Sequence, residues 1–219
     1  MRIFTYLLIA LAAAALGCGV KNFNIAGIKG SGSIKTENRS VSGFKKIKTG
    51  GSVKLDVTVQ KDFSVSVETD DNILALVTTE VDGETLIIGS KENISPSSAT
   101  NIRISMPDLV DLDLSGASSG NVTGIKTDSM EVEISGASKI KLDGEVKSLK
   151  AIASGASKID AENLKAQEVK ADASGASTVT VTAANEADLN ASGASTVYYT
   201  GDPKNLKQNS SGASSIKKK

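Results

Sequence analysis

Apolar and polar residues alternate along much of this chain, which is the pattern of strands with one buried face. Residues 53–59 read Val-Lys-Leu-Asp-Val-Thr-Val, and residues 63–67 repeat the alternation; residues 85–88 and 102–106 are predicted to be further strands. Turn-forming residues separate these runs: Gly50-Gly51, Asp70-Asp71-Asn72 and Asp82-Gly83. Residues 72–80 are ambiguous and could form a short helical turn. No stretch has sustained helical periodicity, so the pattern predicts an all-β protein.

The second half of the chain is a repeat. The tetrapeptide Ser-Gly-Ala-Ser begins at six positions, separated by 20, 19, 20, 18 and 19 residues: Ser115, Ser135, Ser154, Ser174, Ser192 and Ser211. A period near 19 residues indicates stacked structural units that each contact their neighbours.

Alignment of the repeats on their first Ser gives columns of constant character. Five residues before it stand Val110, Met130, Leu149, Val169, Ala187 and Leu206, and three before it stand Leu112, Val132, Ala151, Ala171, Leu189 and Gln208. These positions are predicted to face inward, whereas the position two before the Ser is mostly polar. We therefore expect a β-solenoid whose coils stack about 4.8 Å apart.

The tetrapeptide itself predicts a corner of the solenoid. Gly permits the dihedral angles of the bend, and Ala and Ser fit where a larger side chain would clash with the next coil. On this view Ala156→Leu should destabilise the fold by about 1–3 kcal/mol. A second bend is expected near Gly124, Gly144, Asn163 and Gly201, and the polar Gln208 and Ser210 indicate that the last repeat caps the solenoid.

The N-terminus has the features of an export signal. Residues 3–16 are apolar except for Thr5, follow a charged Arg2, and are too few for the roughly 20 residues of a membrane-spanning helix. Ala15-Leu16-Gly17-Cys18 resembles a bacterial lipobox, which implies cleavage before Cys18 and acylation of its sulfur. The alternative is an ordinary signal peptide with a chance Cys. Gly19 is not acidic, which in proteobacterial lipoproteins points to the outer membrane.

These features divide the chain into three parts. Residues 1–17 are expected to be a lipoprotein signal peptide, and residues 18–33 a lipidated Cys18 with a Gly-rich tether. The β-solenoid follows over residues 34–219. Within it, residues 34–110 are predicted to form irregular N-terminal coils, and residues 111–219 the regular Ser-Gly-Ala-Ser coils.

Composition excludes several classes of function. The 219 residues contain no His, no Trp and one Cys, so imidazole catalysis, an imidazole metal site and a thiolate metal cage are all excluded. Charge is balanced, with 25 basic and 25 acidic residues, which argues against a nucleic-acid partner. Calcium-binding β-rolls need a carboxylate in each turn, and Ser-Gly-Ala-Ser has none. We therefore expect no catalytic residue, metal or cofactor.

With these residues in view, the chain resembles the putative auto-transporter adhesin, head GIN domain family of bacterial exported proteins. This resemblance implies a right-handed, single-stranded parallel β-helix that is exported and often lipidated, and it brings no catalytic or binding residues. The matching segments, besides the Ser-Gly-Ala-Ser ladder, are residues 39–47 (RSVSGFKKI), 71–73 (DNI), 79–88 (TEVDGETLII) and 199–203 (YTGDP).

The predicted function is that of a lipoprotein anchored in the bilayer through Cys18, whose solenoid is a non-catalytic, adhesin-like binding or structural module. The candidate surface for a protein or glycan is a pair of outward columns, and the simpler interpretation is that these are solvated strand faces. They contain Lys139, Lys158, Thr178 and Thr196, and Lys141, Asp160, Thr180 and Tyr198.

The alternative is a β-helix enzyme, a lyase or hydrolase, that acts on polysaccharides. A glycosidase needs two carboxylates about 5–10 Å apart, and Asp113 and Glu133 could come that close in neighbouring coils. The next repeat has Ile152 at this position, so the carboxylate pair does not continue along the column.

Overall fold

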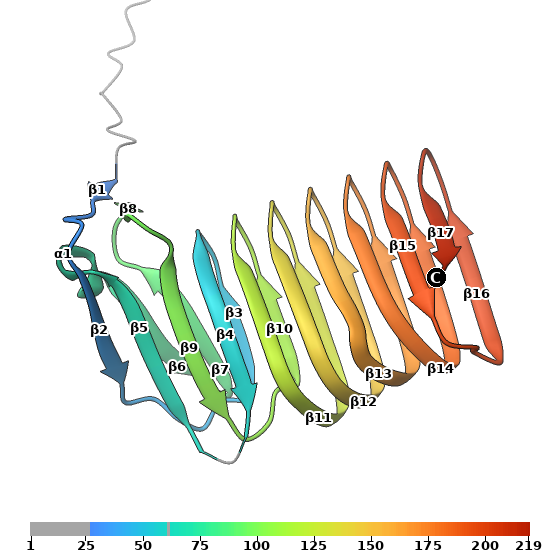
Figure 1. The fold of residues 1–219 in the computed structure, drawn as a ribbon, viewed down its shortest axis with the longest axis horizontal. Helices are drawn as coiled ribbons and strands as arrows, with labels where there is room; N and C mark the ends of the chain where they lie inside the picture. Colours follow the sequence, from blue (N-terminus) through green and yellow to red (C-terminus); the bar gives the residue numbers. More distant parts are fainter. Residues whose placement is uncertain (1–26, 61) are drawn as a thin grey trace, which may run out of the picture.

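The computed structural model describes residues 27–60 and 62–219 and consists almost entirely of β-strands (Figure 1). The predicted signal peptide and the predicted acylation site Cys18 lie outside the described residues, as does part of the predicted tether. Seventeen strands and one helical turn, α1 (Asp71–Leu74), make up this part of the chain.

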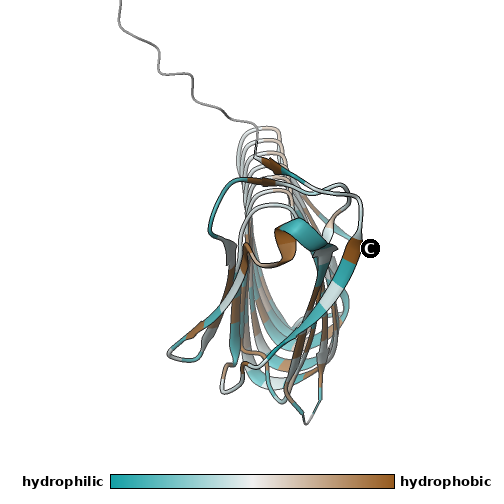
Figure 2. Ribbon diagram, turned by 90° about the vertical axis from the view of Figure 1, so that its left-hand side faces the viewer, coloured by the Kyte–Doolittle hydropathy of each residue, from teal (hydrophilic) through white to brown (hydrophobic). Residues whose placement is uncertain are grey.

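The regular coils have two faces, joined by sharp corners on one side and by wider bends on the other (Figures 1 and 2). We call the strands that precede each corner the first face. They are β3 (Lys46–Thr49), β10 (Asp111–Leu114), the C-terminal halves of β11 (Ser119–Ile134), β12 (Lys139–Ala153), β13 (Lys158–Ala173) and β14 (Thr178–Ala191), and β16 (Asn205–Ser210).

The strands that follow each corner form the second face. They are β4 (Val53–Val59), the N-terminal halves of β11 to β14, β15 (Thr196–Thr200) and β17 (Ser215–Lys218). Both faces are parallel ladders, and their register matches the alignment of the repeats: Leu112 pairs with Val132, Val132 with Ala151, and Ala151 with Ala171. The predicted β-solenoid fold is therefore confirmed.

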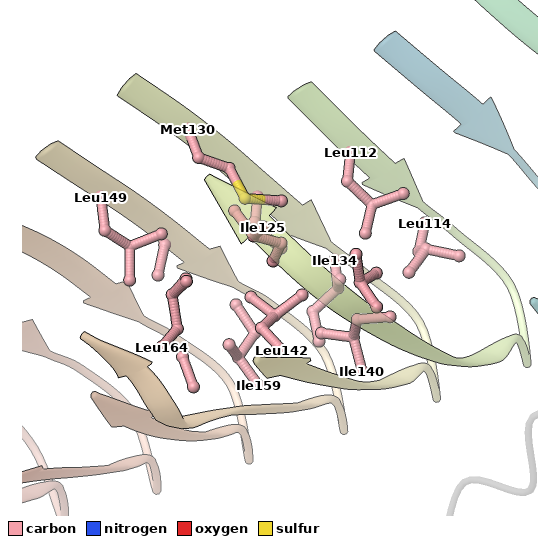
Figure 3. Packing of buried hydrophobic residues seen from close by; sticks show 14 of the residues in the cluster. Leu112, Leu114, Ile125, Met130, Ile134, Ile140, Leu142, Leu149, Ile159 and Leu164 are labelled. Carbon is pink, nitrogen blue, oxygen red and sulfur yellow. The ribbon is translucent and has the colours of Figure 1, made fainter. Parts of the chain in front are cut away.

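A continuous column of apolar side chains fills the space between the faces. Leu112, Leu114, Met130 and Leu149 are at most 1% exposed, and Figure 3 shows Leu112 and Leu114 on one coil, Met130 on the next and Leu149 on the one after. Burial ends in the last coil, where Leu206 is 41% exposed and Gln208 and Ser210 are also exposed. Three positions aligned with buried columns thus face solvent here, because no further coil of the described residues covers them.

The N-terminal part of the chain adds strands to both faces. On the second face, β9 (Thr100–Met106) pairs with β4 in parallel, and β5 (Ser64–Asp70) and β2 (Ile34–Arg39) follow in antiparallel orientation. On the first face, β7 (Thr85–Ser90) pairs with β3 in parallel, and β6 (Val77–Asp82) forms an antiparallel hairpin with β7. One sheet therefore runs from these strands into the regular coils.

Two small elements lie at this end of the solenoid. The predicted helical turn is present as α1, which lies between the two faces in the end-on view (Figure 2) and places Ile73 and Leu74 against Val67 and Val77. A two-stranded sheet of β1 (Ile28–Lys29) and β8 (Ile94–Ser95) lies beside it (Figure 1).

Candidate functional surfaces

The Gly, the Ala and the last Ser of each corner have different surroundings. At Gly155 the backbone has φ of +73°, and an added Cβ would lie 2.6 Å from the carbonyl oxygen of Gly136 in the preceding corner. The amide of the next residue, Ala156, donates to that same oxygen at 2.7 Å. The side chain of Ala156 points to solvent, so the predicted clash at Ala156 is wrong: the tight contact between corners is made by the backbone at Gly.

The fourth residue of the corner is the buried one. Ser118, Ser138, Ser157, Ser177 and Ser195 are at most 3% exposed. Their hydroxyls bond to main-chain carbonyls; Ser157 Oγ donates to Ser154 O at 2.8 Å, and Ser195 Oγ lies 2.8 Å from Ser192 O and 3.0 Å from Ala173 O. These hydroxyls stabilise each corner and join it to the preceding coil.

The predicted outward columns of the second face do come together. Lys139 pairs with Lys158, then with Thr178 and Thr196; the neighbouring column joins Lys141, Asp160, Thr180 and Tyr198. The lysines are exposed, whereas Thr180 is only 4% exposed between its neighbours. Lys219 Nζ lies 5.8 Å from the centre of the Tyr198 ring. The result is a straight, mainly cationic and hydroxyl-bearing surface over four coils.

Asp113 and Glu133 also lie in register, on the first face. Lys48 Nζ is 2.7 Å from a carboxylate oxygen of Asp113, and this hydrogen bond raises the pKa of Lys48 above its ordinary value. Burial, opposed by the charge of Lys46, raises the pKa of nearby Asp111. These side chains line a depression of about 280 Å³ together with Glu131. The Asp113 carboxylate is thus held by an ion pair.

A second polar ladder on the first face was not singled out from the sequence. Asn209 Nδ2 donates to Asn190 Oδ1 at 3.0 Å, and Asn190 Nδ2 donates to Asp172 Oδ1 at 2.9 Å. With Ser174, Ser192 and other corner residues they line a groove of about 330 Å³. The sequence signal for this ladder is the mostly polar column two residues before the first Ser of each corner.

The turn at residues 70–72 holds residues 29–32, the C-terminal end of the predicted tether. Asp70 is fully buried; its carboxylate accepts the amide of Gly32 at 2.7 Å and the hydroxyl and amide of Ser97 at 2.6 and 2.8 Å. The Ser97 hydroxyl, followed by the amides of Ser97 and Gly32, lowers the pKa of Asp70 against the opposing effect of burial.

The two residues that follow extend this contact. Ser31 Oγ donates to Asp71 at 2.6 Å, and the Asn72 amide group bonds both Ser31 N, at 2.9 Å, and the carbonyl of Lys29, at 2.8 Å. We call Asp70, Asp71 and Asn72 the clamp. The sequence showed these residues only as a turn, because their partners are about 40 residues away.

Two kinds of feature are absent from the described residues. No group of three or more Asp, Glu, Cys or His side chains within residues 27–60 and 62–219 is arranged to hold a metal ion. In the same part of the chain, no helix is long and apolar enough to cross a membrane.

Residues 43–203 match the family model described as "Putative auto-transporter adhesin, head GIN domain". No curated protein matches the chain at a significant level.

Several solved structures share the fold. A putative adhesin from Bacteroides fragilis is 23% identical with a TM-score of 0.70, over 88% of this chain and 100% of its own. A putative lipid binding protein from Parabacteroides distasonis is 22% identical with a TM-score of 0.56, over 88% and 99% of the two chains. A putative adhesin from Parabacteroides merdae is 14% identical with a TM-score of 0.56, over 88% and 98%.

Proposed function

Because the chain belongs to the putative auto-transporter adhesin, head GIN domain family, we propose that it is an adhesin-like protein of the bacterial envelope, anchored by lipid and acting without catalysis. In this proposal the N-terminus is acylated at Cys18 and held in the outer membrane. The solenoid presents a rigid surface to a protein or glycan.

The observation that carries the proposal is the pair of outward columns on the second face. Lys139 and Lys158 lie in register on adjacent coils, and Thr178 and Thr196 continue the column, so two ammonium groups and then two hydroxyl groups follow one another at one strand spacing. Such a surface suits an extended partner that makes one contact at each coil. Two observations support the absence of catalysis. Asp113 forms an ion pair with Lys48, and the residue next to Glu133 in the column is Ile152, so the carboxylates do not continue along it.

The anchor has a direct test. The variant Cys18→Ala should move the protein from the membrane fraction to the soluble fraction of the envelope, because no acyl chain can then be attached. The matched control is Ser31→Ala, which keeps Cys18. Retention of Cys18→Ala in the membrane fraction would refute the lipid anchor.

The surface is tested by charge reversal. The purified protein is screened against extracellular-matrix proteins, glycans and envelope components, and binding is then measured for the double variant Lys139→Glu, Lys158→Glu. A loss of binding is expected, since both lysines lie on the proposed surface. Lys170→Glu, Lys207→Glu makes the same change of charge on the first face and serves as control. Equal effects of the two double variants would contradict the assignment of the surface.

A further inference from the structure

The corners of the described coils are joined by a one-directional row of hydrogen bonds. Five corner Ala residues each donate their amide to the carbonyl of the corner Gly in the preceding coil, at 2.7 Å. The donors are Ala117, Ala137, Ala156, Ala176 and Ala194, and the acceptors are Gly51, Gly116, Gly136, Gly155 and Gly175. Each of these five corners therefore receives an acceptor from the coil before it.

In the coil before the first corner, Gly50-Gly51-Ser52, the strands β7 and β9 are joined by residues 91–99 and not by a Ser-Gly-Ala-Ser corner. Ser52 stands where the later corners have Ala, because Ser119 pairs with Lys54 and the two corners are in register. Among residues 27–60 and 62–219, no acceptor is found for the Ser52 amide. A Cβ on Gly51 would meet nothing within 4 Å, whereas at Gly155 it would meet the preceding carbonyl at 2.6 Å.

The space in front of this corner is a cavity of about 320 Å³, near the lower end of the range for ligand sites. Gly50, Gly51 and Ser52 form one side. Five apolar residues also line it: Val53, Val77, Ile88, Ile94 and Pro96. The single charged lining residue among those described is Glu92.

We propose that this cavity binds an extended peptide segment, with a main-chain carbonyl accepting the Ser52 amide and a small apolar side chain against Ile88 and Ile94. The peptide carbonyl takes the place of the Gly carbonyl that the next five corners receive. In the corner row the accepting group is a neutral main-chain carbonyl, and at this site Glu92 would repel an anion. The site therefore favours a neutral carbonyl over a carboxylate.

The site lies at the end of the solenoid, away from the outward columns of the second face. It therefore goes beyond the proposed function, and either assignment can fail while the other stands. Recognition through main-chain hydrogen bonds with a pocket for a side chain is an established mode of peptide binding.

The test uses the full chain carrying Cys18→Ala, so that no attached acyl group competes, and nuclear magnetic resonance to follow the Ser52 amide. The probe is leucine capped as N-acetyl and N-methylamide, which is neutral and carries two carbonyls and one apolar side chain. We expect a saturable shift of the Ser52 signal and at least a tenfold slower hydrogen exchange of its amide, with the Ala117 amide unchanged.

Two variants and one competing ligand complete the experiment. Ile94→Ala should weaken binding of the probe at least threefold, whereas Ile28→Ala, at the paired and 37% exposed position of β1, should leave it unchanged. Octanoate should bind more weakly than the capped leucine. The absence of a saturable shift at Ser52, equal effects of the two variants, or tighter binding of octanoate would each overturn the proposal.

Discussion

At the scale of single residues, the small side chains of the corners have three different physical causes. Gly155 is required because of its positive φ and the carbonyl of Gly136 next to it. Ser157 is required because its buried hydroxyl bonds the carbonyl of Ser154. Ala156 is exposed, so nothing in the packing requires its size.

This difference predicts opposite results at adjacent positions. Gly155→Ala should lower the free energy of unfolding by about 1–3 kcal/mol, because Ala would be strained at this φ and its Cβ would press on Gly136. Ala156→Leu should change it by about 0.5 kcal/mol or less, as is usual at exposed positions. Chemical denaturation of both variants measures the contrast. A larger loss for Ala156→Leu would show that the corner is misassigned.

The sequence could predict that these residues form corners, but it could not separate their roles. A tetrapeptide of small residues is compatible with crowding at any of its positions. Which side chain points inward depends on the dihedral angles of the Gly, and these follow from stacking on the previous corner rather than from local sequence.

At the scale of elements, the clamp connects three segments: the end of β5 with α1, the chain before β2, and the loop between β8 and β9. Asp70 is its centre because a buried carboxylate is stable only with full hydrogen bonding, here from Gly32 and Ser97. The clamp thus fixes the point at which the N-terminal segment meets the solenoid.

The clamp should make stability depend on pH. The folded-state pKa of Asp70 is lowered, so its stabilising contribution is present above the unfolded pKa of about 3.9 and is lost as the pH falls through the folded value. Asp70→Asn should lower Tm at neutral pH and flatten its decline in acid. The control is Asp143→Asn, at an exposed position. Parallel Tm curves for wild type and Asp70→Asn would contradict this role.

The regular strands could be predicted from the sequence because each inward column repeats in every coil. The antiparallel pairing of β5 and β2 could not be predicted. The same alternation is present in β5, but alternation is equal for parallel and antiparallel pairing, and β2 has only one apolar residue, Ile34. Their position beyond β9 is set by partners far along the chain, and no repeat of residues 34–110 marks it.

At the scale of the whole molecule, the strength of packing depends on the place of a coil along the solenoid. Leu149 and Leu206 occupy the same inward column, yet Leu149 is fully buried and Leu206 is 41% exposed. Interior coils are covered on both sides, whereas the last coil is covered on one.

A matched pair of truncations measures this gradient. Leu149→Ala should lower the free energy of unfolding by about 2–5 kcal/mol, the range for buried Leu. Leu206→Ala should lower it by about 0.5 kcal/mol or less, since half of its surroundings are solvent. Urea denaturation gives both values. Equal losses of unfolding free energy in the two variants would mean that the last coil is covered in solution.

The direction of the corner hydrogen bonds has an electrostatic consequence. In the described corners each amide points toward the N-terminal end and each carbonyl toward the C-terminal end, so the peptide dipoles of the row add instead of cancelling. As in a helix, partial positive charge then accumulates at the first corner and partial negative charge at the last. A chain with no formal net charge thus carries an aligned row of corner dipoles, and at the positive end of this row Glu92 lines the same cavity as the first corner.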